Sequence, residues 1–437
     1  MKKKNIYLTV VLFGCFLTLL LPCYGQNCSL FSNEHYTVSV RADKADARYK
    51  AGETGMFEIV ASKSGAPVDN VQWSCKMLQD ELNTAYQGYL KFTAGKAGVP
   101  FKFDKPSFML LIVSPPAITN QKPLVMSGAA CVPERLAPSM PKPDDFDAFW
   151  NGKKALLNAM TNQPVLTPVP EFTDQQIETY SVCMENINGT RLHAYFSKPR
   201  GEGPFPVLLQ LYAAGTYSIA PAAAAKYARG GVMALDLNPH DLENGQPESY
   251  YKDARSRLGA YYHAGRADRE TSYFLRMFCA CYRAGQYLAN RKEWDKKHFV
   301  VHGSSMGGGQ ALATAYLCPQ VTAVAANVPA LCDHTGREIG RVAGWPKWVE
   351  YQDGKADEKE LNASRYFDCV NFAYTIKTKV LMSCGFIDRT CPPQSVYAAY
   401  NVLKCDKRMM EMIIRGHEYP PEFTEAWNAF FKAEIGQ

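Results

Sequence analysis

A serine between closely spaced glycines is the residue of this 437-residue chain that most clearly points to chemistry. Gly303–Gly307 reads G-x-S-x-G, with Ser305 at its centre. A serine that projects from a tight strand-to-helix turn leaves no room for side chains two positions away, which explains glycine on both sides. The apolar run Phe299–Val301 predicts a buried strand before the turn, and Ala311–Leu317 predicts a helix after it.

We therefore predict that Ser305 is a nucleophile. In such a turn the backbone N–H of Met306 is placed to donate to an oxyanion, and the helix N-terminus adds positive potential. A second donor should come from the loop after the predicted strand 206–212, where we assign the N–H of Ala214. The competing interpretation is a glycine-rich structural turn with an idle serine.

A serine hydroxyl is a weak nucleophile and needs an imidazole to accept its proton. Two of the eight histidines, His334 and His417, follow Ser305 in the sequence. His417 lies after the last predicted strand and before the last predicted helix, where the base is expected when the chain order is serine, acid, histidine. His334 follows the strand next to the serine turn, so we keep it as the weaker alternative.

The carboxylate that orients the histidine should follow the intervening strand. Asp388 comes directly after the predicted strand Lys379–Cys384, in the segment Gly385–Pro393. We predict Asp388 as the acid, whereas the alternative is an aspartate that only caps the next helix. Asp333 and Asp368 are weaker candidates for the acid.

Strands and helices alternate from about residue 177 onward. The regions 177–183 and 191–196 predict a hairpin across Asn188-Gly189. Further strands are expected at 206–212, 232–236, 321–328, 379–384 and 409–414, with a long helix over 269–290. This alternation predicts an α/β fold of the α/β-hydrolase type, with a doubly wound, mostly parallel sheet. Ligands bind such sheets at the carboxyl ends of the strands.

The N-terminal region has a different pattern. Short β-like runs separated by turn residues occupy 36–40, 55–60, 71–75, 88–92 and 107–113. They predict a small all-β sandwich of immunoglobulin-like type. Trp73 and nearby tyrosines either fill its core or line a sugar-binding surface, and a core position is the more common one.

These patterns divide the chain into a signal peptide at 1–25, a β-sandwich at 26–118, a proline-rich linker at 119–143 and an α/β-hydrolase domain at 144–437. Prolines recur over 115–143, which is typical of a stiff connector. Residues 144–160 predict an amphipathic helix with an acidic start.

The first 25 residues have the features of an export signal. Lys2, Lys3 and Lys4 precede an apolar run over 6–21, and cleavage is expected before Gln26. We expect an exported, periplasmic or secreted protein with no membrane span in the mature chain; lipidation of Cys23 is the less favoured alternative. Without these three lysines the formal net charge falls from +6 to +3. The sequence has no basic stripe interleaved with aromatic residues, so we do not expect nucleic acid as a partner.

The 14 cysteines are scattered, so they predict neither a particular disulfide pairing nor a metal site. We also expect no organic cofactor, because a serine, a histidine and an aspartate suffice for acyl transfer.

Several segments together resemble the acetyl xylan esterase / cephalosporin C deacetylase family. The resemblance extends over about residues 140–437 and is carried by the segments 144–150, 303–309, 370–373, 385–401 and 416–418. The stretch Gly385–Pro393 around Asp388 is the most specific of them. The resemblance implies an α/β-hydrolase fold, removal of acetyl groups from sugar hydroxyls, acetylated oligo- or polysaccharide substrates and a triad of Ser305, Asp388 and His417.

Three departures from that family concern the substrate pocket. Met306 stands where the family usually has glutamine, and Tyr212-Ala213-Ala214 stands for its histidine-glycine-tyrosine. Its arginine-glycine-glutamine is replaced around Asn238–Asp241. These changes affect substrate identity and leave assembly into a homo-oligomer open. We predict substrate contacts from Tyr212, Trp345 and Trp348, the two tryptophans either stacking on sugar rings or packing a lid.

Two other functions remain open on the sequence. A serine peptidase of the prolyl oligopeptidase kind shares the fold and the triad order. A glycan-binding protein with an inactive site is the other alternative.

Overall fold

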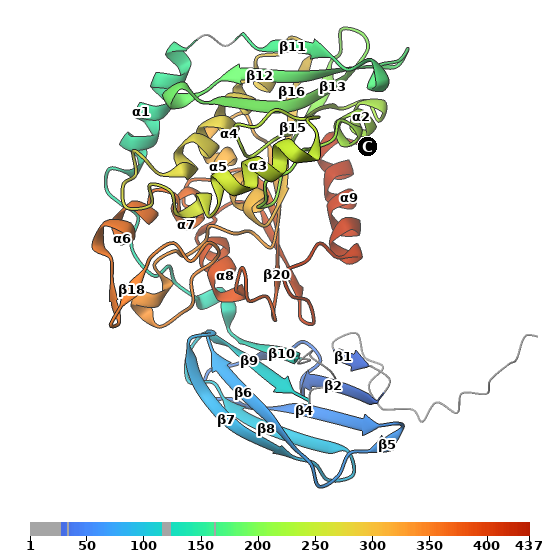
Figure 1. The fold of residues 1–437 in the computed structure, drawn as a ribbon, viewed down its shortest axis with the longest axis vertical. Coiled ribbons are helices and arrows are strands. Elements are labelled where there is room, and N and C mark those ends of the chain that lie inside the picture. The colour runs from blue at the N-terminus through green and yellow to red at the C-terminus, as the bar shows by residue number, and fades with distance from the viewer. Residues whose placement is uncertain (1–27, 33–34, 116–123, 161–162) are drawn as a thin grey trace, which may run out of the picture.

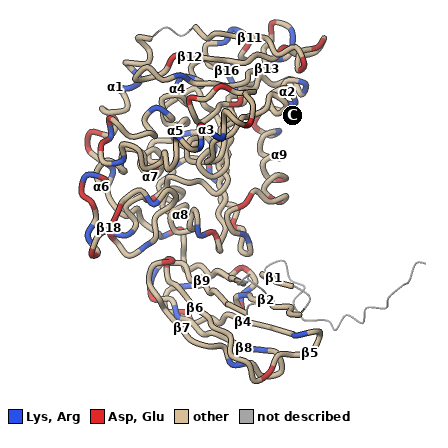
Figure 2. Tube along the Cα trace, in the orientation of Figure 1, with Lys and Arg blue, Asp and Glu red and all other residues tan. Residues whose placement is uncertain are grey.

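The computed structural model describes residues 28–32, 35–115, 124–160 and 163–437. Figure 1 shows a β-rich N-terminal part beside a larger part of mixed strands and helices. The expected signal peptide and Cys23 lie outside the described residues. Within the described ranges, every helix falls short of the length and apolarity needed to span a bilayer. Basic and acidic residues are intermingled along the chain rather than gathered in one stripe (Figure 2).

The N-terminal part consists of two five-stranded sheets. The first contains β1 (Ser29–Ser32), β2 (Tyr36–Ala42), β4 (Thr54–Lys63), β5 (Ala66–Pro67) and β8 (Lys96–Lys102). The second runs in the order β3 (Arg48–Tyr49), β10 (Val125–Cys131), β9 (Ser107–Ser114), β6 (Gln72–Gln79) and β7 (Asn83–Lys91). Buried and half-buried residues alternate along β4, as expected for a strand with one face on a core.

Apolar side chains from both sheets share one core. Phe57 of the first sheet and Trp73 of the second are 0% and 1% exposed. The Trp73 ring packs edge-on against Phe92, with the centroids 4.8 Å apart. Trp73 is therefore a core residue and does not form a sugar-binding surface.

The expected linker over 119–143 is wrong in its first half. Strand β10 lies inside that range and pairs antiparallel with β9 and parallel with β3. The residues of β10 are small, mostly apolar and almost all buried, and none of them is proline. This part of the expected linker can therefore form a strand of the sheet. The connector that follows begins with the short 3-10 helix Pro133–Arg135, where the prolines resume.

The larger part is built on a nine-stranded sheet. Its order is β11 (Val165–Pro168), β12 (Ile177–Glu185), β13 (Arg191–Pro199), β15 (Met233–Leu237), β14 (Phe205–Leu211), β16 (Trp294–Ser304), β17 (Ala323–Asn327), β20 (Lys379–Gly385) and β21 (Lys407–Met412). Strands β15 to β21 of this order pair parallel, and β11 to β13 pair antiparallel. The expected hairpin and the mostly parallel sheet are confirmed.

Helices cover both faces of this sheet, so its central strands are buried on both sides (Figure 1). One face packs against α1 (Phe146–Ala159), α4 (Tyr273–Ala289), α5 (Met306–Leu317), α7 (Cys369–Ala373) and α8 (Pro393–Val402). The other face packs against α2 (Ala222–Arg229) and α9 (Pro421–Ile435). Two further helices, α3 (Glu248–Leu258) and α6 (Glu358–Ser364), lie outside these layers, and β18 (Tyr351–Gln352) pairs with β19 (Lys355–Ala356).

The two parts pack directly against each other where β9 and β10 meet β20 and α8. The Phe108 ring contacts the rings of Phe386 and Tyr397, with centroids 5.2 Å and 5.8 Å apart. Gly128 of β10 lies against the backbone of Phe386, so closely that a Cβ there would be 2.5 Å from the Phe386 carbonyl oxygen. A glycine at this position is therefore required by the contact between the two parts.

We expect Gly128→Ala to lower the free energy of unfolding by about 1–3 kcal/mol, because the added methyl group overpacks a contact with backbone. Urea unfolding followed by tryptophan fluorescence measures this change. The matched control is Gly152→Ala on α1, where a Cβ meets nothing within 4 Å. That change should leave stability equal or raise it by roughly 0.5–1 kcal/mol. Equal effects of the two substitutions would contradict the close contact at Gly128.

Candidate active site

The turn at Ser305 has the geometry that the glycine spacing predicts. Ser305 ends the connection from β16 to α5 with φ 56° and ψ −121°, a conformation that L-residues rarely adopt. A Cβ at Gly303 would lie 2.2 Å from the Gly307 carbonyl oxygen, and one at Gly307 would lie 2.2 Å from the Leu211 carbonyl oxygen. Both glycines are therefore required by close backbone approach, and the strained serine is held between them.

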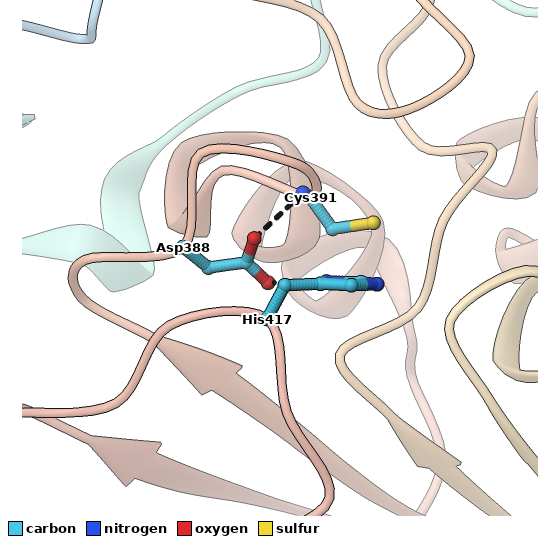
Figure 3. A group of neighbouring side chains, drawn as sticks. All are labelled: Asp388, Cys391 and His417. Atoms are coloured by element: carbon cyan, nitrogen blue, oxygen red, sulfur yellow. Dashed lines mark hydrogen bonds and ion pairs between the residues drawn. The ribbon is translucent and has the colours of Figure 1, made fainter. Parts of the chain in front are cut away.

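Ser305, His417 and Asp388 are brought together by one chain of hydrogen bonds. The Ser305 hydroxyl donates to His417 Nε2, with 2.7 Å between Oγ and Nε2. His417 Nδ1–H donates to Asp388 Oδ2 at 2.8 Å, and Figure 3 shows these two side chains side by side. This arrangement can move the hydroxyl proton to the imidazole while the carboxylate stabilises the resulting cation.

Asp388 is held rigidly in its loop between β20 and α8. Its other oxygen, Oδ1, accepts hydrogen bonds from the backbone N–H groups of Thr390 at 2.8 Å and Cys391 at 2.9 Å. The bond from Cys391 is drawn in Figure 3. The Asp388 side chain is 0% exposed. One oxygen of the carboxylate therefore caps the backbone that follows it, and the other faces His417. A capping aspartate and an aspartate that orients the histidine are thus compatible descriptions of Asp388.

The alternative candidates occupy a different cluster. Asp368 accepts hydrogen bonds from the backbone N–H groups of Asp333 and His334, at 2.9 Å and 2.7 Å. Asp333 forms an ion pair with Arg341 at 2.8 Å. The His334 ring packs against Trp348. These interactions assign the three residues to the packing of the segment that follows β17.

A residue that the sequence interpretation missed links the parts of the site. Asn327, at the end of β17 and fully buried, donates through Nδ2 to Ser304 Oγ at 2.8 Å and to the Glu418 carbonyl at 3.0 Å. Its Oδ1 accepts from the Ser383 hydroxyl at 2.7 Å. Asn327 therefore joins the serine turn, the histidine loop and β20. An asparagine inside an apolar strand was the one available signal.

The predicted oxyanion donors lie at the start of α5 and in the loop after β14. Met306 is the first residue of α5, where backbone N–H groups lack a carbonyl partner within the helix. Ala214 lines the same cavity as Ser305 and His417. Its neighbour Gly215 is fixed by His240, whose Nε2 donates to the Gly215 carbonyl at 3.0 Å.

His240 was noted in the sequence only as part of a departure from the family pattern. Its Nδ1 accepts from the Tyr273 hydroxyl at 2.8 Å, so the ring is neutral with its proton on Nε2. Burial lowers the pKa of His240 from 6.5 to about 4, helped by the Arg276 guanidinium. The nearby Tyr261 hydroxyl donates to Met306 Sδ. These polar contacts reach the backbone next to Ala214 and the side chain of Met306.

A cavity of about 340 Å³ opens over Ser305 and His417. Apart from these two residues, it is lined by Ala213, Ala214, Ser304, Val328, Trp345, Thr390, Glu418 and Tyr419. Trp345 thus lies where the sequence placed it. The predicted substrate contact of Trp348 is wrong, and its packing alternative agrees with the structure: Trp348 is 0% exposed, donates to the Arg266 carbonyl at 2.9 Å and stacks on Phe367. Tyr212 is absent from the lining of this cavity, so its predicted substrate contact is wrong; burial, with the neighbouring Asp236 carboxylate, raises the pKa of its hydroxyl.

The neutral state of His240 gives the protein a specific pH dependence. The imidazole has a folded-state pKa of about 4 and an unfolded value near 6.5, so below pH 6.5 the unfolded chain takes up a proton that the folded chain refuses. Stability should therefore fall as pH drops from 6.5 toward 4. We expect His240→Gln to reduce the fall in unfolding free energy between pH 7 and pH 4.5 by roughly 2 kcal/mol, measured by urea unfolding. Parallel curves for both proteins would contradict a neutral buried His240.

Known proteins are similar to this chain over most of its length. The profile of the acetyl xylan esterase (AXE1) family matches residues 134–435. Acetyl esterase Axe7A of Xylanibacter ruminicola is 29% identical over 441 residues, which cover 99% of this chain and 97% of that protein. The solved acetyl xylan esterase from Paenibacillus sp. R4 has a TM-score of 0.60 at 27% identity, covering 69% of this chain and 98% of its own.

Acetyl xylan esterase 1 from Thermoanaerobacterium sp. JW/SL YS485 has the same fold, with a TM-score of 0.60 at 24% identity and coverage of 68% and 96%. The family profile spans more than half of the chain and includes the serine turn, the acid loop and the histidine loop. The chain therefore belongs to the acetyl xylan esterase family and is a carbohydrate esterase with the α/β-hydrolase fold.

Proposed function

We propose that this protein removes acetyl groups from sugar hydroxyls by an acyl-enzyme mechanism in which Ser305 is the nucleophile. The observation that carries the proposal is the continuous hydrogen-bond chain from Ser305 Oγ through His417 to Asp388, which begins at the floor of a cavity. A hydroxyl bonded to an oriented imidazole is the arrangement that activates serine for acyl transfer.

The mechanism follows from the positions of these groups. His417 accepts the Ser305 proton as Oγ attacks the acetyl carbonyl, and the N–H groups of Met306 and Ala214 stabilise the oxyanion. His417 then gives the proton to the leaving sugar oxygen. Water, deprotonated by the same imidazole, releases acetate and restores Ser305. Asp388 holds the ring in the Nδ1–H tautomer throughout.

The residues that line the cavity beside Ser305 suit a substrate with a small acyl group. Ala213, Ala214 and Val328 offer little volume and no charge beside Ser305, which suits the methyl group of an acetate ester. Trp345 lies at the same cavity and offers an aromatic face to the sugar ring. We propose an acetylated oligo- or polysaccharide such as acetylated xylan as the substrate.

We further propose that the mature chain is exported and has two domains. The first is an immunoglobulin-like sandwich that includes β10 and ends at residue 131, and the second is the esterase domain from residue 144. The shared core of the two N-terminal sheets supports the first assignment. The apolar run behind three lysines at the N-terminus supports export.

The catalytic assignment predicts the effects of two substitutions. Ser305→Ala and Asp388→Asn should each lower kcat/KM for acetate release by roughly a thousandfold or more, because the first removes the nucleophile and the second the orienting carboxylate. Acetate released from acetylated xylan and from p-nitrophenyl acetate measures the loss. Asp147→Asn, on the surface of α1, is the control and should keep full activity.

The same preparations separate the other candidate functions. Hydrolysis of peptide p-nitroanilides with a comparable kcat/KM would favour a peptidase. An unmodified Ser305 after treatment with a fluorophosphonate, together with no acetate release, would favour a non-catalytic glycan-binding protein and overturn the proposal.

The role of Trp345 is testable on its own. Trp345→Leu should raise KM for an acetylated xylo-oligosaccharide about tenfold and leave KM for p-nitrophenyl acetate nearly unchanged, because only the sugar loses its stacking face. Tyr89→Leu is the control, an exposed aromatic on β7 of the N-terminal part. A rise in KM with Tyr89→Leu alone would move the sugar contact to the N-terminal domain.

A further inference from the structure

The turn between β6 and β7 of the N-terminal part reaches into the esterase domain beside the acid loop. The Asp80 carbonyl accepts hydrogen bonds from Val342 N–H and from Gln394 Nε2, both at 3.1 Å. Asn83 Nδ2 donates to the Gly340 carbonyl at 2.9 Å. The turn is thus bonded to the segment before Trp345 and to the first turn of α8, which directly follows the acid loop.

This turn has an unusual backbone that is held in place from both sides. Asp80 and Glu81 have φ values of 50° and 56°, which non-glycine residues adopt at a cost. The Asp80 N–H donates to the Phe108 carbonyl at 2.8 Å, and Asp80 Oδ1 accepts from Phe108 N–H at 2.9 Å. Strand β9 therefore fixes Asp80, and the next side chain, Glu81, enters the interface between the two parts.

Glu81 places a buried carboxylate among charged groups of the esterase domain. Its side chain is 8% exposed, and Oε2 lies 3.5 Å from Arg389 Nε. Lys347 and Asp388 are its other charged neighbours. Burial raises the pKa of Glu81 to about 7, and the cations Lys347 and Arg389 oppose that rise. The carboxylate therefore depends on these two cations to remain ionised.

Lys347 connects the two loops that line the cavity. Its Nζ donates to the carbonyl of Ala343 and to the carbonyl of Thr390, the latter at 3.3 Å. The Thr390 carbonyl also accepts from Trp345 N–H at 3.0 Å. Thr390 and Trp345 both line the cavity over Ser305. The ammonium group of Lys347 thus ties the acid loop to the Trp345 loop, and Glu81 is its carboxylate neighbour.

We propose that Glu81 of the N-terminal domain is a positioning residue of the active site, which acts through Lys347 and Arg389 on the loops that carry Asp388 and Trp345. The N-terminal domain is accordingly part of the catalytic unit and not a separate appendage. This inference rests on the proposed roles of Asp388 and Trp345. Arg389, next to Asp388 in the chain, couples the carboxylate directly to the acid loop.

The ionisation of Glu81 sets the pH range in which this carboxylate can act. With a pKa of about 7, its carboxyl group is mostly neutral below that pH and mostly ionised above it. The attraction between Glu81 and the cations Lys347 and Arg389 is therefore present above about pH 8 and largely absent near about pH 5. Removing the carboxylate should lower kcat/KM only where it is ionised.

The experiment compares kcat/KM for p-nitrophenyl acetate between about pH 4.5 and pH 9 in the full-length protein. Glu81→Gln should lower kcat/KM by roughly threefold to tenfold above about pH 8 and leave it nearly unchanged near about pH 5, and Arg389→Gln should show the same pH-dependent loss. Lys347→Met also removes the hydrogen bonds to the Ala343 and Thr390 carbonyls, so it should lower kcat/KM over the whole range. Two controls should keep the wild-type profile. Asn83→Ala removes a neutral contact of the same turn, and Glu58→Gln removes a carboxylate whose ion pair with Arg41 lies within the N-terminal part.

Each outcome decides one proposal. A loss in Glu81→Gln that grows as the pH rises through about 7, with both controls unchanged, supports the positioning role of Glu81, and an unchanged profile contradicts it. If Glu81→Gln does not fold, Arg389→Gln decides, because it removes the ion-pair partner of Glu81: the same loss supports the role and an unchanged profile contradicts it. A wild type that is active and depends on Ser305, while all the charge variants keep its profile, overturns only this inference. A wild type that releases no product overturns the proposed esterase mechanism itself.

Discussion

The close backbone approach around Ser305 is the constraint on which the rest of this structure depends. The serine adopts a strained conformation with positive φ because β16 must turn directly into α5 close to the Leu211 carbonyl. Any side chain at Gly303 or Gly307 would displace that backbone. The strain is offset by hydrogen bonds to the turn, with Ser305 N–H donating to the Asn327 carbonyl at 2.9 Å and the Ser305 carbonyl accepting from Ala330 N–H at 2.9 Å.

The polar groups behind the site are buried, and each is fixed by more than one partner. Asn327 binds three segments at once, and Asp388 has one oxygen for its own loop and one for His417. In a low-dielectric interior a satisfied polar network specifies one arrangement, because breaking any bond leaves an unpaired group. The same principle applies to His240, which keeps one tautomer by pairing each ring nitrogen and so fixes Gly215.

The N-terminal part is close to this network. Its contact with the larger part includes the ring packing of Phe108 on Phe386 and the close approach of Gly128 to backbone. It also includes the buried Glu81 carboxyl group, which lies near the cations Lys347 and Arg389. A buried charge costs free energy unless it is paired, so removing one partner of a buried pair costs more than breaking a surface ion pair. Arg48, which bonds to Glu411 at 2.6 Å, adds a second charged link between the two parts.

The local pattern of the chain was enough to predict the strand-to-helix turn, the mostly parallel sheet and the fact that Ser305, Asp388 and His417 meet in space. Each of these depends on short-range rules: glycine where backbone approaches closely, apolar runs where strands are buried, and a fixed order of segments along the sheet. The linker prediction failed at β10 because proline content describes chain stiffness, whereas the pairing of β10 with β9 is a long-range contact.

Only the tertiary structure decided which aromatic residue faces the cavity and what surrounds the acid. Trp345 and Trp348 are three positions apart in the same segment, and the fold exposes one at the cavity and buries the other. Glu81 lies more than 300 positions before Asp388, and nothing in its own sequence surroundings indicates the esterase domain. Such contacts arise from the packing of whole sheets, which brings distant residues together for reasons that no local window contains.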